Sequence, residues 1–230
     1  MLGASRTSLA QARERGRELA GTSGVDLGPL SSGRPGGAPL LGAARPLPHT
    51  KGRAMKLYRC RICGETYLGH GVPTECPFCG ADAEYIVLTE DYPEDVNDVQ
   101  LTEVERADLE TSIELETSNT RFYLAMAARK DNPKLSSAYK RLARVEAEHC
   151  SVFSKLAKMP KPADLLEPGE ELGTWEADID ESLRRENLAS ALYAEFAGRA
   201  TSPRLREIWS AVSRVEETHI ELDGVAKGYI

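Results

Sequence analysis

Two sets of glutamate and histidine residues with identical spacing stand out in the sequence. In each set a single glutamate precedes a Glu-x-x-His motif by 30 residues, and the second set follows the first by 70 residues. On a helix, Glu-x-x-His places both side chains about one turn apart on one face, where they can reach one ion. Four carboxylates and two imidazoles suit two metal ions that share a pocket. The candidate ligands are Glu116, Glu146, His149, Glu186, Glu216 and His219.

The spacing also indicates an internal repeat. Thirty residues allow one helix, a short loop and the return of a second helix, so each set predicts a helical hairpin. A single Glu-x-x-His motif on a Glu-rich helix usually lies on a solvent-exposed face. Here, however, landmarks outside the motifs also match after a shift of 70 residues. The matched pairs are Tyr123 with Tyr193, Arg129 with Arg199, Pro133 with Pro203, and Tyr139 with Trp209.

Aromatic residues share the predicted inner face of the hairpins. Tyr123 and Tyr193 each follow the single glutamate of their set by seven residues, nearly two helical turns. Two roles stay open for these tyrosines: packing in the core, or hydrogen bonding to ligand carboxylates as a second layer around the metals. For Tyr139 and Trp209 we expect core packing.

Four of the five cysteines predict a second metal site. Cys60 and Cys63 form one Cys-x-x-Cys-Gly motif, and Cys76 and Cys79 form another. The glycine after each pair allows the positive φ that a tight metal-binding turn needs. Four thiolates give a tetrahedral site for iron or zinc, and spacing alone does not choose between them. The fifth cysteine, Cys150, is interpreted as a small core residue.

Helix signals place four helices after the cysteine motifs, at about 102–130, 133–158, 174–200 and 203–228. A Thr-x-x-Glu capping box begins the first helix, and Asn-Pro and Ser-Pro pairs begin the second and fourth. The connection 159–173 can extend about 50 Å, more than the length of a 26-residue helix at about 39 Å. It therefore permits the third helix to run parallel to the second.

The first 54 residues differ from the rest of the chain. They contain 10 of the 19 glycines, 5 of the 13 prolines and few large apolar residues, so we expect disorder. The segment reads either as a targeting peptide or as an extension upstream of a true start at Met55, and we favour the second. The predicted domains are a disordered extension (1–54), a four-cysteine domain (55–90), a linker (91–100) and a helical domain (101–230).

Charge and cysteine usage limit the classes of partner. The formal net charge is −7, and the excess of acidic residues lies after residue 54. This charge argues against nucleic acid as a partner. No apolar run approaches the roughly 20 residues of a membrane helix. Cysteines arranged as metal ligands rather than as a disulfide framework suit a reducing compartment, so we expect a cytoplasmic protein.

Together, the cysteine module and the paired Glu-x-x-His hairpins resemble the rubrerythrin family over residues 55–228. The order resembles reverse rubrerythrins, with the rubredoxin-like part first. The resemblance implies a mainly α fold: a ferritin-like four-helix bundle with a small metal-bound β module. It implies three irons, two of them bridged by Glu146 and Glu216 and one held by the four cysteines, where zinc is the alternative. It also implies a peroxidase in oxidative-stress defence, electrons from an unidentified reductase, and a homodimer.

The ligand set departs from the best-known peroxidases of that family, which carry a further glutamate one turn after the third-helix ligand. Ala189 stands at that position here, and Asn119 is its counterpart on the first helix. A six-ligand site is nearer to the ferroxidase type. We expect a slower peroxide reductase, with a ferroxidase, an iron-binding protein or a dioxygen reductase as alternatives, and a zinc-stabilised binding module as a further one.

Overall fold

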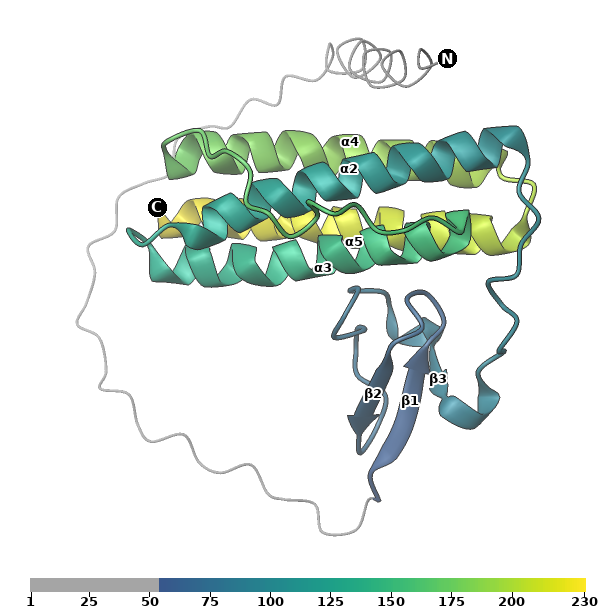
Figure 1. Cartoon of the computed structure of the whole chain (residues 1–230). Helices are drawn as coiled ribbons and strands as arrows, with labels where there is room; N and C mark the ends of the chain where they lie inside the picture. The colour runs from purple at the N-terminus through teal and green to yellow at the C-terminus, as the bar shows by residue number, and fades with distance from the viewer. Residues whose placement is uncertain (1–53) are drawn as a thin grey trace, which may run out of the picture. The chain divides into compact units, whose positions relative to one another are not determined.

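The computed structural model describes residues 54–230 (Figure 1), so the predictions for residues 1–53 lie outside the described range. The described chain begins with a small β module and continues into four long helices. The three strands are β1 (Lys56–Cys60), β2 (Thr66–Gly69) and β3 (Ile86–Leu88). The helices are α2 (Glu103–Ala128), α3 (Pro133–Ala157), α4 (Trp175–Arg199) and α5 (Pro203–Ala226).

The β module is an antiparallel sheet in the order β2-β1-β3, with Tyr58 of β1 opposite Tyr67 and Leu88. Strands of three to five residues bury too little surface to be stable by themselves, which fits a module that depends on bound metal. One cluster of buried apolar side chains extends from the module into the bundle, and includes Ile62 and Ile208.

The helix starts follow the capping signals of the sequence. The Thr102 side chain accepts a hydrogen bond from the backbone N–H of Glu105, and the reciprocal bond completes a capping box. The side chains of Asn132, Thr174 and Ser202 cap the other three helices by accepting one backbone N–H each, without the reciprocal bond. Each observed helix lies within its predicted range and ends at most two residues short of it.

The segment between α3 and α4 runs back along the bundle, so α3 and α4 point in the same direction (Figure 1). Contacts hold this crossover against α2: the backbone N–H of Gly169 donates to the carbonyl of Arg121 at 2.8 Å, and Arg121 forms an ion pair with Asp164. The four helices with one crossover confirm the ferritin-like fold class.

The repeat extends to ion pairs at both ends of the bundle. Arg129 pairs with Asp178 at 2.7 Å, and Arg199 donates from Nε to Asp108 at 2.8 Å. The two arginines are related by the 70-residue shift, and so are the two aspartates. The hairpins α2–α3 and α4–α5 therefore form equivalent contacts with each other.

Glu105 joins the start of α2 to the turn between α4 and α5. Its carboxylate accepts hydrogen bonds from the backbone N–H groups of Thr102, Thr201 and Ser202, each at 2.9 Å. Burial alone would raise the pKa of Glu105, but these donors lower it from 4.5 to about 2.

We expect Glu105→Ala to lower the free energy of unfolding by about 3 kcal/mol, because it leaves several donors unpaired. Because the folded-state pKa is depressed, the stabilisation is fully present above pH 4.5 and is lost as the pH falls toward 2. Urea denaturation at several pH values measures the effect. Glu103→Ala, at an exposed position in the same helical turn, is the control. Equal losses in the two variants would contradict the assignment.

Candidate metal centres

The bundle brings all six predicted glutamate and histidine ligands into one cluster, called here the carboxylate cluster. Two overlapping groups of four residues have potential ligand atoms within 4.8 Å of one another. One group contains Glu116 and His149, the other contains Glu186 and His219, and both groups contain Glu146 and Glu216. The two shared glutamates are those expected to bridge a metal pair.

The orientation of the ligand atoms fits bound metal. Nδ1 of His149 and Nδ1 of His219 each lie 2.7–3.7 Å from oxygens of three glutamates. Even so, these two nitrogens and at least one oxygen of each cluster glutamate have no hydrogen-bond partner among residues 54–230. Buried polar atoms that face one another without hydrogen-bonding geometry are suited to a common cation between them. The carboxylate cluster is therefore suited to a di-iron site.

Electrostatics leads to the same conclusion. Burial, together with the neighbouring carboxylates, raises the pKa of Glu116 and of Glu186 well above the ordinary value. Burial disfavours charge on His149, but Glu216 and Glu146 outweigh it and raise the pKa of that histidine to about 10. Four buried carboxylates are costly unless cations balance them, and two divalent metal ions carry the matching charge.

Each predicted tyrosine donates a hydrogen bond to a cluster glutamate, but across the two hairpins. Tyr123 on α2 donates to Glu186 on α4, and Tyr193 on α4 donates to Glu116 on α2. Sequence spacing aligned each tyrosine with the glutamate of its own helix and could not show this exchange. Both tyrosines are fully buried, and each fixes the orientation of one candidate ligand glutamate through its hydrogen bond.

The four predicted cysteines also come together in the β module. Cys60 Sγ lies 3.8 Å from Cys79 Sγ, and Cys63 Sγ lies 3.7 Å from Cys76 Sγ. All four are buried. The module thus carries a four-cysteine, rubredoxin-like site. Gly80 has φ +77°, and a Cβ at this position would lie 2.8 Å from Val215 of α5, so only glycine fits between the module and the bundle.

A hydrogen bond connects the two metal sites within one chain. His149 Nε2 lies 2.9 Å from the carbonyl oxygen of Cys79. The ring therefore contacts a cysteine residue of the module with one nitrogen and faces the carboxylate cluster with the other. This contact was not predicted, because sequence spacing does not show which surface of the bundle the module covers.

His219 differs from its repeat partner His149. It is 6% exposed, whereas the other five members of the carboxylate cluster are completely buried. It lines a cavity of about 470 Å³ at the junction of module and bundle, together with Cys76, Arg141 and Thr218. This cavity reaches the carboxylate cluster at His219.

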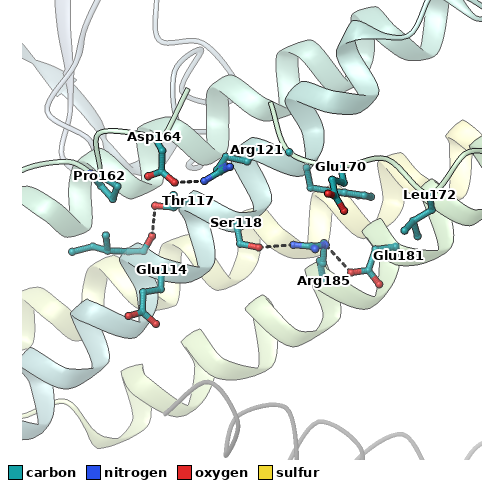
Figure 2. Close-up of a pocket in the computed structure, with 13 residues that line it drawn as sticks. Glu114, Thr117, Ser118, Arg121, Pro162, Asp164, Glu170, Leu172, Glu181 and Arg185 are labelled. Atoms are coloured by element: carbon teal, nitrogen blue, oxygen red, sulfur yellow. Dashed lines mark hydrogen bonds and ion pairs between the residues drawn. The ribbon is translucent and has the colours of Figure 1, made fainter. Parts of the chain in front are cut away.

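A larger cavity of about 700 Å³ lies between α2, α4 and the crossover and contains no member of the carboxylate cluster (Figure 2). Its two arginines are already paired. Arg121 contacts Asp164, and Arg185 contacts Glu181 and Ser118. Paired charges offer a ligand little net attraction, and we assign no function to this cavity.

The positions that could carry a seventh carboxylate are both buried and neutral. Ala189 is fully buried on α4, and Asn119 on α2 accepts a hydrogen bond from Arg185 at 3.2 Å. The carboxylate cluster is thus limited to six candidate ligands among the described residues.

Sequence reasoning missed polar residues outside this set. Asp223 is fully buried on α5 and accepts a hydrogen bond from Tyr139 at 2.6 Å. Ser182 donates to the hydroxyl oxygen of Tyr123 at 3.0 Å. The spacing of Asp223, four residues after His219, is a signal that could have placed it on the inner face.

Comparisons with known proteins agree with this organisation. Residues 58–86 match the family model described as "Rubrerythrin, rubredoxin-like domain", and residues 108–175 match "Rubrerythrin". Reverse rubrerythrin-1 of Clostridium acetobutylicum is 35% identical over 112 residues. The chain has a reverse-rubrerythrin-like arrangement.

The rubredoxin-like match contains all four cysteines, and the rubrerythrin match contains Glu116, Glu146 and His149 of the first hairpin. The alignment with reverse rubrerythrin-1 covers 44% of this chain and 62% of that relative. No solved structure gives a significant match. Within residues 54–230, no helix has the length and apolar character that crossing a membrane requires.

Proposed function

We propose that the chain is a di-iron oxidoreductase that reduces hydrogen peroxide in defence against oxidative stress. One iron would be held by Cys60, Cys63, Cys76 and Cys79, and two by the carboxylate cluster. Bound iron would supply reversible one-electron chemistry at each site. The overall step is balanced: peroxide takes two electrons and two protons and leaves as two waters.

The contact between Cys79 and His149 carries the proposal. Because the contact is 2.9 Å long, only the Cys79 side chain and carbonyl group and the His149 ring lie between the Cys79 sulfur and the carboxylate cluster. A purely structural metal module would not need a ligand-to-ligand contact with a second metal site. His149 donates its Nε2 proton to the carbonyl oxygen of Cys79 and directs its Nδ1 toward Glu216, which lies 3.2 Å away.

This contact supports electron transfer within a chain, with an unidentified reductase supplying the module. The family resemblance implies transfer between the subunits of a homodimer, and a homodimer remains a prediction. The oxidant, peroxide or dioxygen, would enter through the cavity at His219. None of the five cysteines forms a disulfide, which supports the prediction of a reducing, cytoplasmic location.

A ferroxidase or dioxygen reductase is the second candidate. Ala189 is the observation that favours it, because a buried alanine offers no carboxylate for an iron that moves between ligands. The contact between the module and His149 argues for the reductase, since a ferroxidase takes its electrons from incoming ferrous iron.

The two candidates differ in the oxidant they use and in the source of electrons. The iron-loaded protein is reduced anaerobically and mixed with one oxidant at a time, and both iron centres are followed by absorption. We expect peroxide to oxidise both centres faster than dioxygen does. Oxidation by dioxygen alone, with catalytic turnover of added ferrous iron, would contradict the peroxide reductase and favour the ferroxidase.

A further inference from the structure

The 70-residue repeat is broken on one side of the carboxylate cluster, where Tyr139, Trp175 and Asp223 lie. We propose that Tyr123, Tyr139 and Trp175 form a redox relay that moves single oxidising equivalents from the carboxylate cluster toward the protein surface. Asp223 is the proton acceptor for Tyr139. This relay rests on the proposed redox function of the cluster, and its residues contribute no metal ligand.

Three aromatic rings form a continuous stack that leads away from the cluster. Tyr123, which donates to Glu186, has its ring centroid 5.8 Å from that of Tyr139, with an interplanar angle of 26°. Tyr139 lies 6.1 Å from Trp175, also at 26°. Phenol and indole are the aromatic side chains most easily oxidised by one electron, and stacked rings at contact distance permit transfer from ring to ring.

A proton acceptor stands at the middle of the stack. A phenol that loses an electron becomes a strong acid, so its oxidation is favoured when a base lies within hydrogen-bond distance. Tyr139 donates to Asp223 Oδ1 at 2.6 Å. The other oxygen of Asp223 has no hydrogen-bond partner among the described residues, so this buried carboxylate has capacity to accept the proton.

The outer end of the stack is near the surface. Trp175 is the first residue of α4 and is 6% exposed, whereas both tyrosines are fully buried. The guanidinium of Arg129 lies 4.4 Å from the centroid of the Trp175 ring. A small reductant in solvent can therefore approach the relay at Trp175 and not at the tyrosines.

The other half of the repeat lacks the equivalent residues. Position 139 corresponds to Trp209, position 223 to Phe153 and position 175 to Glu105. The ring contacts of Tyr193 are with Phe153 at 5.4 Å and Phe196 at 6.3 Å, and phenylalanine is much harder to oxidise. Core packing alone explains a phenylalanine at such a position, whereas a buried aspartate is costly and needs another reason.

A reduced chain with iron at all three positions would hold three electrons, so a second peroxide, which takes two, would find only one of them left. Tyr139 gives one electron inward through Tyr123 and passes its phenol proton to Asp223. Trp175 then reduces the Tyr139 radical, which takes the proton back. A small thiol in solvent gives one electron to Trp175 and loses its proton to become a thiyl radical, and two such radicals couple to a disulfide. The relay thus protects the ligands from oxidation.

The test uses the full chain loaded with iron, reduced, and then given excess peroxide without an electron donor. Freeze-quench electron paramagnetic resonance detects radicals, and peptide mass spectrometry locates oxidised side chains. We expect a radical signal and oxidation of Trp175 in the wild type. In Tyr139→Phe and in Asp223→Asn, oxidation of Trp175 should fall to the level of protein loaded with redox-inert zinc. Trp175→Phe should keep a tyrosyl radical.

Trp209→Phe is the matched control, because it changes the repeat partner of Tyr139 and should leave Trp175 oxidation unchanged. Oxidation of Trp175 that persists in Tyr139→Phe, or that is equal in the zinc-loaded protein, would overturn the relay. Oxidation of the iron without oxidation of Trp175 would also overturn the relay while leaving the proposed function intact. Failure of peroxide to oxidise the iron at all would overturn both.

Discussion

Replacing Glu146 with alanine is expected to remove both metal ions from the bundle and to leave the four-cysteine site loaded. Glu146 belongs to both four-residue groups of the carboxylate cluster, so its loss takes a ligand from each metal position. We expect the affinity for bundle iron to fall by at least about 100-fold, since even the loss of a residue that only supports a ligand costs 10–100-fold. Metal analysis should give about one iron per chain instead of three, with the ferric–thiolate colour unchanged.

Glu148→Ala provides the matched control for this experiment. Glu148 lies two residues along the same helix, is half-buried and belongs to neither metal group. This variant should keep three irons per chain. Retention of both bundle irons by Glu146→Ala would show that the carboxylate cluster has been assigned wrongly.

Replacing Cys63 with alanine should abolish steady-state turnover while preserving one round of peroxide reduction by the bundle. The variant lacks one of four thiolates, so the module loses its iron and the red colour. In the proposed function, a reduced iron pair would still hold two electrons for one peroxide, but external electrons would no longer reach it. We expect turnover with a reductase to fall by at least about 100-fold, which corresponds to about 2.7 kcal/mol.

Cys150→Ala is the control for the loss of a thiol. Cys150 is fully buried on α3, lies 3.5 Å from the hydroxyl of Thr117 and is outside the four-cysteine group. It should keep both metal sites and full turnover. Undiminished turnover in Cys63→Ala would mean that electrons enter the bundle without the module.

Local chemistry made much of this fold predictable. The capping box at Thr102 and the prolines at positions 133 and 203 fix where helices begin, because they satisfy or remove backbone donors that a helix start leaves free. The matched Glu-x-x-His motifs then place the ligands on the inner faces, because helix geometry fixes which side chains share a face. The fold class was predicted correctly for these reasons, and the four-cysteine site was predicted correctly from its two Cys-x-x-Cys-Gly motifs.

Contacts between distant elements were not predictable in the same way. Tyr123 bonds to Glu186 rather than to the glutamate of its own helix because α2 and α4 cross the cluster side by side. The bond between His149 and Cys79 depends on where the module docks, which no periodic pattern encodes. Asp223 was overlooked because a lone acidic residue near a helix end usually faces solvent.

The repeat explains both the symmetry of the ligands and the asymmetry around them. The two hairpins supply equivalent glutamates, histidines, tyrosines and end ion pairs. They differ in their contacts with the rest of the molecule. His149 contacts the module, whereas His219 lines a cavity. Tyr139 donates a hydrogen bond to Asp223, whereas its repeat partner Trp209 donates to Ser112. A duplicated metal site with different surroundings can receive electrons on one side and an oxidant on the other.

The proposed electron path is tested by measuring whether peroxide draws electrons from the four-cysteine iron through the bundle. Fully reduced wild type and Glu146→Ala are mixed anaerobically with peroxide, and the return of the ferric–thiolate colour is recorded by stopped-flow absorption. This path predicts rapid return of the colour in the wild type and a persistently colourless, reduced module in the variant. Equal rates of colour return in the two proteins would contradict it.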